Sequence, residues 1–207
     1  GYEAALITAS QFLPHHQGVQ FPPGFGLQAA RHLSGGLGMI PRITIKPYWQ
    51  TEAMLAAFLG QPIVIVGHHQ DAANGLEALE EIAETVNGFG AVRWCSLTEI
   101  ARANYTTRLE GATLSVSLGA RRIVLPVPAG VREVRIHRPW LADHAIEPLM
   151  VKGSDQTVRA IPSASAESAP VTVMGPGTIE ICSPVSNPVN AQEVPAQEQL
   201  LSSFISG

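Results

Sequence analysis

The chain has 207 residues, of which 45% are hydrophobic and 14% charged, and its formal net charge is −4. This composition fits a folded globular protein and gives no overall electrostatic footprint for a nucleic-acid backbone, so we expect no DNA or RNA partner. The 2 cysteines exclude a cysteine-rich scaffold and a cysteine-based zinc cluster, and no run approaches the roughly 18 apolar residues of a membrane span.

The first 45 residues predict two strands separated by a long loop. Residues 3–9 indicate a short buried strand, and residues 39–45 indicate a second one. Between them, residues 10–38 are rich in Gly, Pro, His and Gln, and only residues 27–33 suit one or two helical turns. Loops of this length inside a compact domain are commonly functional.

The next segment predicts a helix followed by a strand. A helix over residues 51–59 would have Thr51 as its N-cap and Gly60 as its stop. Residues 62–67 form a continuous apolar run, which predicts a strand buried on both faces, as in a parallel sheet.

The best-marked element is an amphipathic helix over residues 76–86. Its apolar side chains recur at helical spacing and its glutamates occupy the other face, while Asp71 or Asn74 could cap its start. A strand over residues 91–96 follows, and a Ser-x-x-Glu capping box at Ser96 opens another helix. This alternation of strands and helices predicts βαβ units and a parallel sheet.

After residue 105 the pattern changes to short β-branched or alternating runs separated by Gly, Pro, Asp and Ser. It predicts an antiparallel β-sandwich domain over residues 106–188 and a tail over residues 189–207. The expected strands are residues 112–118, 120–127, 131–138, 157–162, 170–174 and 178–182. Five arginines in this region are expected to form a solvated sheet face, namely Arg121, Arg122, Arg132, Arg135 and Arg138.

His68 and His69 follow directly after the predicted strand at residues 62–67. Ligands of parallel α/β sheets bind outside the carboxyl ends of the strands, where a histidine can serve as acid, base or metal ligand. Neighbouring side chains of an extended segment point to opposite faces, so only one of the two would enter a pocket. A functional site and a structural polar strand end both remain open.

His15 and His16 lie in the long loop and repeat the His-His-Gln sequence found at His68. Together with Asp71 they could form a metal site, although the chain has no H-x-x-x-H or H-E-x-x-H pattern. A solvated loop is the preferred interpretation of this pair. His137, in the predicted sandwich, has no spacing signal and is interpreted as structural.

Trp49 and Arg42 are candidate contacts for a substrate. Trp49 is one of several side chains that could offer aromatic surface to a sugar ring, although packing is the commoner role of such residues. Arg42 lies in the middle of the predicted strand at residues 39–45, where a charged side chain needs a partner. A buried ion pair and a substrate contact are equally compatible with that position.

Several stretches together resemble the closing strands of a polysaccharide deacetylase barrel of carbohydrate esterase family four. They are GYEAALIT, MIPRITI, PIVIVGHHQDAANG with the acidic helix after it, and GAVRWCSLTEIARANY. The resemblance covers about residues 1–105 and implies an α/β fold, in which this segment is the C-terminal part of a distorted (β/α) barrel of the deacetylase type. The β-sandwich domain would follow it.

In that family a late strand ends in a Leu-x-x-His-like motif whose histidine is the general acid. Ile65 to His68 fits this motif with Ile in place of Leu, and a register one residue later, ending at His69, competes with it. The resemblance implies that His68 is the catalytic acid and that Ile65 lines the acetyl pocket. His69, Arg42 and Trp49 complete the candidate substrate-binding residues.

The family's metal-binding aspartate, its H-x-x-x-H histidines and its catalytic aspartate are not found in this chain. Because Gly1 is not an initiator methionine, we interpret the start as a cut within a longer product. The zinc or other divalent metal and its ligands would then belong to the intact protein, and this chain could associate with the missing N-terminal part. His68 alone could not perform the reaction, since activating water and protonating the leaving group are separate tasks.

The sequence therefore predicts part of a polysaccharide deacetylase-like hydrolase that acts on acetylated glycans in an extracytoplasmic location, whether periplasmic, envelope-associated or secreted. The alternative is a non-catalytic carbohydrate-binding or cell-envelope protein, in which the β-sandwich binds a glycan or a partner. A third hypothesis is a hydrolase with its own metal site at His15, His16 and Asp71.

Overall fold

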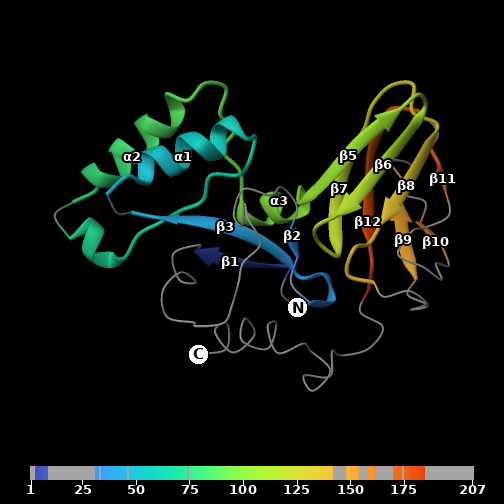
Figure 1. Cartoon of the computed structure of the whole chain (residues 1–207), viewed down its shortest axis with the longest axis horizontal. Coiled ribbons are helices and arrows are strands. Elements are labelled where there is room, and N and C mark those ends of the chain that lie inside the picture. The colour runs from blue at the N-terminus through green and yellow to red at the C-terminus, as the bar shows by residue number, and fades with distance from the viewer. Residues whose placement is uncertain are drawn as a thin grey trace, which may run out of the picture. The chain divides into compact units, whose positions relative to one another are not determined.

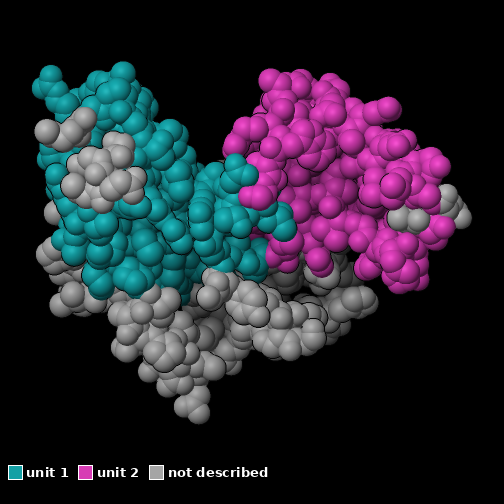
Figure 2. All heavy atoms as spheres, turned by 180° about the vertical axis from the view of Figure 1, so that it is seen from behind, with its two compact units in different colours: residues 1–5, 29–39, 97–207 teal, residues 6–28, 40–96 magenta. Residues whose placement is uncertain are grey.

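The computed structural model describes residues 3–8, 31–32, 34–45, 47–73, 75–141, 148–153, 158–161, 170–173 and 175–184 (Figure 1). The chain divides into two compact units, which are coloured separately in Figure 2. Unit 1 comprises residues 1–5, 29–39 and 97–207, and unit 2 comprises residues 6–28 and 40–96. Each unit is therefore assembled from segments that are not consecutive in sequence.

The described residues of the N-terminal half form short strands and three α-helices. In chain order the elements are β1 (Ala4–Thr8), β2 (Arg31–His32), the 3₁₀ turn η2 (Ser34–Gly36), β3 (Gly38–Thr44), α1 (Trp49–Phe58), β4 (Ile65–Val66), the 3₁₀ turn η3 (His69–Ala72), α2 (Glu77–Asn87) and α3 (Leu97–Arg102). The strand order is β1-β3-β2, with β4 also paired to β3. The β2–β3 pair is antiparallel and the β3–β4 pair is parallel.

The predicted (β/α) barrel is wrong. The described residues form three separate sheets and only three short α-helices, and none of these sheets closes on itself. Of the strand expected over residues 62–67, only Ile65 and Val66 pair, and residues 91–96 contain no strand. The side chains at 63–66 are only half-buried and those at 91–94 are exposed, so neither run has the second covering layer that a buried parallel strand needs.

Helix α1 begins earlier than its capping signal predicted. Thr51 lies inside the helix, while Tyr48 occupies the N-cap position with a φ of 75° and no side-chain cap. Trp49, Ala53 and Ala56 form its buried face, because their spacing places them on one side of the helix. Gly60, the residue predicted to stop this helix, has a φ of 64° in the left-handed region, as is common for a glycine just after a helix end.

Helix α2 matches its prediction within one residue at each end, but its start is not capped as expected. Leu76 takes the N-cap position without a side-chain hydrogen bond. Asp71 belongs instead to η3, and Asn74 lies outside the described residues. The helical turns expected over residues 27–33 are wrong where they can be checked, since Arg31–His32 is strand β2.

From residue 105 on, the described residues of unit 1 form two four-stranded sheets. Their strands are β5 (Tyr105–Glu110), β6 (Thr113–Leu118), β7 (Arg122–Val127), β8 (Glu133–His137), β9 (Leu149–Lys152), β10 (Val158–Ile161), β11 (Val171–Thr172) and β12 (Gly177–Cys182). One sheet has the order β11-β8-β6-β5 and the other β10-β9-β12-β7. All six strands expected after residue 105 are present, while β5 and β9 were not expected. The pairing is not purely antiparallel, because β6 and β8 run parallel.

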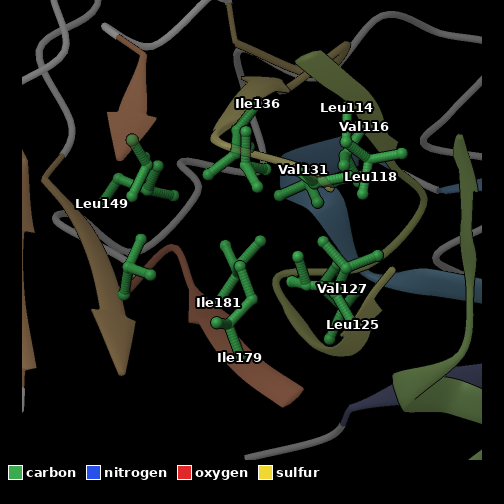
Figure 3. Packing of buried hydrophobic residues seen from close by; sticks show 14 of the residues in the cluster. Leu114, Val116, Leu118, Leu125, Val127, Val131, Ile136, Leu149, Ile179 and Ile181 are labelled. Atoms are coloured by element: carbon green, nitrogen blue, oxygen red, sulfur yellow. The ribbon is translucent and has the colours of Figure 1, made fainter. Parts of the chain in front are cut away.

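The two sheets share one hydrophobic core. Side chains of β6 alternate between half-buried and buried, and those of β7 between exposed and buried. The inward-pointing residues include Leu118 of β6, Leu125 of β7 and Ile181 of β12, each at most 1% exposed (Figure 3). Burial of a side chain of this size contributes about 1.5–3 kcal/mol, so this core is the main source of stability in unit 1.

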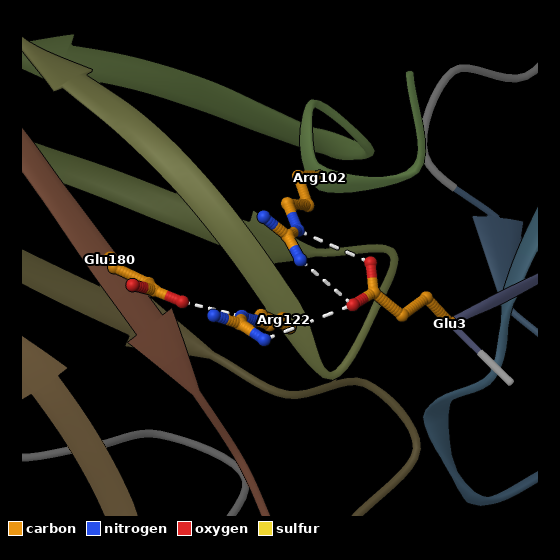
Figure 4. Close-up of polar contacts among 4 residues, drawn as sticks. All are labelled: Glu3, Arg102, Arg122 and Glu180. Atoms are coloured by element: carbon orange, nitrogen blue, oxygen red, sulfur yellow. Dashed lines mark hydrogen bonds and ion pairs between the residues drawn. The ribbon is translucent and has the colours of Figure 1, made fainter. Parts of the chain in front are cut away.

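An ion-pair network connects Glu3 with three elements of unit 1, namely α3, β7 and β12 (Figure 4). Glu3, just before β1, accepts two hydrogen bonds from the guanidinium of Arg102, at 3.2 and 2.9 Å. Arg122 lies 3.8 Å from the same carboxylate and also donates to Glu180 of β12. The hydrogen bonds from Arg102 hold the pKa of the Glu3 carboxyl below its ordinary value.

The predicted solvated face of five arginines is wrong for Arg138, which is fully buried and donates to the Ser183 hydroxyl at 3.2 Å. Arg121 is half-buried and donates to the carbonyl oxygens of Gly35, Ser183 and Pro184. Each of these two guanidiniums therefore serves the structure of unit 1. Arg135 does lie on an exposed sheet face.

Trp140 packs closely against the turn η2. Its ring lies edge-on to His32, with the ring centroids 5.3 Å apart. A Cβ atom built on Gly36, whose φ is +78°, would come within 2.5 Å of Trp140 Cε2. Glycine is needed here both for its backbone conformation and for this close approach. None of the helices in the described ranges is long and apolar enough to cross a membrane.

We predict that Gly36→Ala destabilises unit 1 more than the matched change Gly130→Ala. Both glycines have a left-handed φ, +78° and +87°, but a Cβ on Gly130 meets nothing within 4 Å. Each variant should lose about 1–2 kcal/mol from backbone strain, and Gly36→Ala a further 1–3 kcal/mol, roughly, from overpacking against Trp140. Urea unfolding measures the free energy of unfolding of the wild type and of both variants. An equal loss in the two variants would contradict the packing role of Trp140.

We also predict that Glu3→Gln lowers the free energy of unfolding at pH 7 by up to about 1 kcal/mol, because the pairs are partly exposed. The pKa of Glu3 is below its ordinary 4.5 in the folded state, so its stabilisation is present above that value and is lost as pH falls through the folded pKa. The difference in free energy of unfolding between wild type and Glu3→Gln should therefore become smaller as the pH is lowered from 7 to 3. Glu81→Gln, on exposed α2, is the control, and a pH-independent difference would contradict the ion-pair role.

Candidate functional site

His68 and His69 lie just after the short strand β4, and both side chains are exposed. The backbone N–H of His68 donates to Asp71 Oδ2 at 2.6 Å, and the backbone N–H of Asp71 donates to the His68 carbonyl oxygen at 2.9 Å. The Asp71 carboxylate thus satisfies the backbone N–H at the start of η3, as the acidic residue of a helix capping box does. The structure therefore gives His68 and Asp71 a local structural role at the end of the strand.

The candidate substrate-binding residues of unit 2 are placed mostly in or near its core. Trp49 is 6% exposed and packs with Ile43, Ala53 and Ala56. Ile65 is half-buried against the same cluster, and Arg42 is half-buried in β3. In the described part of the chain, no contact brings these three side chains and His68 together in one cavity.

His15 and His16, the other half of the proposed metal site, lie outside the described residues. Within the described ranges, no group of three or more His, Cys, Asp or Glu side chains is arranged to hold a metal ion. Asp71 alone cannot make such a site, since metals of this class take several protein ligands. Both cysteines, Cys95 and Cys182, are free thiols.

A different group of side chains converges on unit 1. The outer face of β5, β6 and β8 contains a hollow of about 280 Å³, lined by Thr106, Thr107, Arg108, Ser115, Val116, Ser117, Arg135, Ile136 and His137. The buried residues of β6 and β8 point to the core, so the alternate residues of both strands must point outward into this hollow.

Strand pairing arranges the outward side chains in rows across the three strands. Ser115 is paired with Arg108 of β5 on one side and with Arg135 of β8 on the other. The same register places Ser117 between Thr106 and His137, and Thr113 between Glu110 and Glu133. The face therefore has a hydroxyl and imidazole row, an arginine row and a glutamate row.

Polar contacts hold these rows in place. Ser117 Oγ lies 3.3 Å from His137 Nδ1, within reach of a hydrogen bond. Arg108 pairs with Glu110 at 2.7 Å, and Arg135 lies 3.9 Å from Glu133. The arginine side chains remain 80% and 62% exposed, so a ligand in the hollow can reach both guanidiniums. A hydroxyl-rich or anionic small molecule, or part of a polymer, fits this chemistry.

The sequence contained only part of the signal for this face. Alternation around Ser115, Ser117 and Arg135 predicts polar outward residues on separate strands. It does not predict that β6 pairs with β8 rather than with β7, its neighbour in sequence. His137, interpreted as structural from sequence, lies in the hollow because of that pairing.

Comparison with models of known protein families gives no match, and no curated protein and no solved structure matches the chain either. The deacetylase resemblance therefore stays a prediction. That prediction placed the metal ligands and the catalytic base outside this chain, so the described residues have no bearing on them.

We predict that Asp71→Ala loosens η3 and costs about 1 kcal/mol, the usual effect of losing a cap. The backbone N–H of His68 should exchange with solvent faster in this variant, because it loses its acceptor. Amide hydrogen exchange measures this directly. His69→Ala, an exposed change in the same turn, is the control and should leave the His68 amide unchanged. Equal exchange in wild type and Asp71→Ala would contradict the capping role.

Proposed function

We propose that this chain is a non-catalytic carbohydrate-binding protein whose β-sandwich holds a glycan in the hollow on β5, β6 and β8. The observation that carries the proposal is the convergence there of hydroxyl, guanidinium and imidazole groups from three strands. Sugars present many hydroxyl groups, each of which can accept from a guanidinium and can both donate to and accept from a side-chain hydroxyl or a neutral imidazole.

The support lies in how rigidly the groups are held. Ser115 and Ser117 alternate with Leu114, Val116 and Leu118, which are at most 4% exposed in the shared core. Because the core fixes the backbone of β6, the hydroxyls above it are already positioned, and a ligand has little ordering cost to overcome. His68, by contrast, is exposed and engaged with its neighbour Asp71.

The hollow differs from a common sugar site in one respect. Among the described residues that line it there is no Trp, Tyr or Phe, so none of them offers an aromatic face on which a sugar ring could stack. Recognition would depend on hydrogen bonds and charge, and the affinity for a neutral sugar should be modest. Each neutral hydrogen bond contributes only about 0.5–1.5 kcal/mol net.

Isothermal titration of the full chain with neutral, acetylated, carboxylated and sulfated oligosaccharides tests the proposal. We expect Thr106→Val and Ser117→Ala to weaken binding of a recognised glycan by about two- to tenfold each, which corresponds to one hydrogen bond. Thr178→Val, an equivalent exposed change on β12 in the other sheet, is the control and should have no effect.

Binding of none of these oligosaccharides would overturn the carbohydrate proposal. Binding that Thr106→Val and Ser117→Ala leave unchanged would place the glycan elsewhere and would equally overturn the assignment to this hollow. Release of acetate from the acetylated oligosaccharides by the full chain would contradict the non-catalytic part of the proposal.

A further inference from the structure

We infer that the ligand of this hollow carries an isolated anionic oxygen group, a carboxylate or a sulfate or phosphate ester, bound above Ser115 between Arg108 and Arg135. This inference rests on the proposed glycan-binding function but specifies the chemical class that the site selects. It follows from the register of three strands and from the charges of the rows beside Ser115.

The two arginines are spaced to hold one group between them. They lie on β5 and β8, on either side of β6, so their backbones are separated by two strand spacings, or about 9.5 Å. Arginine side chains are long enough to bend toward each other over Ser115 from both sides. An oxyanion at that point could accept from two guanidiniums and from the Ser115 hydroxyl.

The existing ion pairs do not prevent this. Arg108 and Arg135 are paired with Glu110 and Glu133, but these pairs are exposed, and exposed pairs contribute only about 0–1 kcal/mol. A guanidinium has five N–H donors, and one carboxylate uses at most two of them in a bidentate pair. The glutamates can therefore orient the arginines while further donors remain for a ligand.

The glutamate row sets a limit on the ligand. Glu110 and Glu133 lie two residues along their strands from the arginines, or about 6.6 Å at the backbone. A second anionic group of the ligand placed over this row would meet two carboxylates. The formal net charge of −4 likewise gives no long-range attraction for polyanions. The site should therefore prefer one anionic group flanked by hydroxyls over a densely charged polymer.

The test is titration of the full chain with matched oligosaccharides: a neutral one, the same backbone with one carboxylate, and the same backbone with one sulfate or phosphate. Inorganic sulfate and a densely sulfated dextran complete the set of probes. We expect at least one singly charged oligosaccharide to bind about tenfold more tightly than the neutral one, which is the usual gain from charge-assisted hydrogen bonds. Comparison of the affinities for the carboxylated and for the sulfated or phosphorylated oligosaccharide identifies which anionic group is preferred.

Variants locate the anion. Arg108→Gln and Arg135→Gln should each weaken binding of the charged oligosaccharide more than binding of the neutral one, so that the roughly tenfold ratio between their dissociation constants is mostly lost. Arg159→Gln removes the same charge from an exposed position on β10 in the other sheet and should keep the preference. Glu133→Gln should improve binding of sulfated dextran, because it removes part of the repulsive row.

The outcomes separate this inference from the proposed function. A neutral oligosaccharide bound as tightly as its charged counterparts, with Arg135→Gln without effect, overturns the inference and leaves the glycan-binding function intact. Inorganic sulfate binding that Arg108→Gln and Arg135→Gln abolish, with no oligosaccharide bound, overturns the glycan function and supports the anion site. An equal effect of Arg159→Gln shows a general charge effect and overturns the inference.

Discussion

Packing of branched side chains between the two sheets of unit 1 fixes the geometry on which the candidate site depends. Val116 and Ile136, each 1% exposed, point into the shared core from adjacent strands. Because side chains alternate along a strand, their neighbours Ser115, Ser117 and Arg135 must point outward. A shift of one residue in either strand would bury these polar groups and expose the core, so the register is strongly specified.

The parallel pairing of β6 with β8 is the second constraint. Strand β7, between them in sequence, belongs to the other sheet, so the chain leaves one sheet and returns beside β6. This crossover brings Arg135 next to Ser115 and His137 next to Ser117. With β7 between the strands instead, Arg108 and Arg135 would be a further strand apart, and a single anionic group could not contact both.

Local pattern in the sequence predicted six of the eight described strands from β5 to β12, and helix α2, with bounds close to those observed, because these elements depend on the periodicity of neighbouring residues. It did not predict which strands pair, since pairing is decided by contacts between distant segments. The same limit explains Arg138. Its place in an alternating run suggested solvent, but the tertiary structure encloses its side chain and provides Ser183 as a partner.

The barrel prediction depended on the assumption that apolar runs become paired strands. Residues 62–67 have the composition of a buried strand, but only β3 pairs with them and their side chains stay half-buried or exposed. In helix α1, too, only some of the apolar side chains are covered. Ala53 is fully buried, while Met54 and Phe58 are 56% and 85% exposed. Hydrophobic composition therefore indicates what a segment can bury, but not whether a neighbour covers it.

The difference between the two histidine environments also bears on function. His68 is engaged with Asp71, three residues away, and a contact of that kind can form in any chain with a turn there. His137 lies beside Ser117, a residue 20 positions away, in a row that also contains Thr106. Only tertiary structure creates the second arrangement. Recognition of a ligand requires groups from several elements held at fixed positions, and in the described part of the chain the face of β5, β6 and β8 meets that requirement.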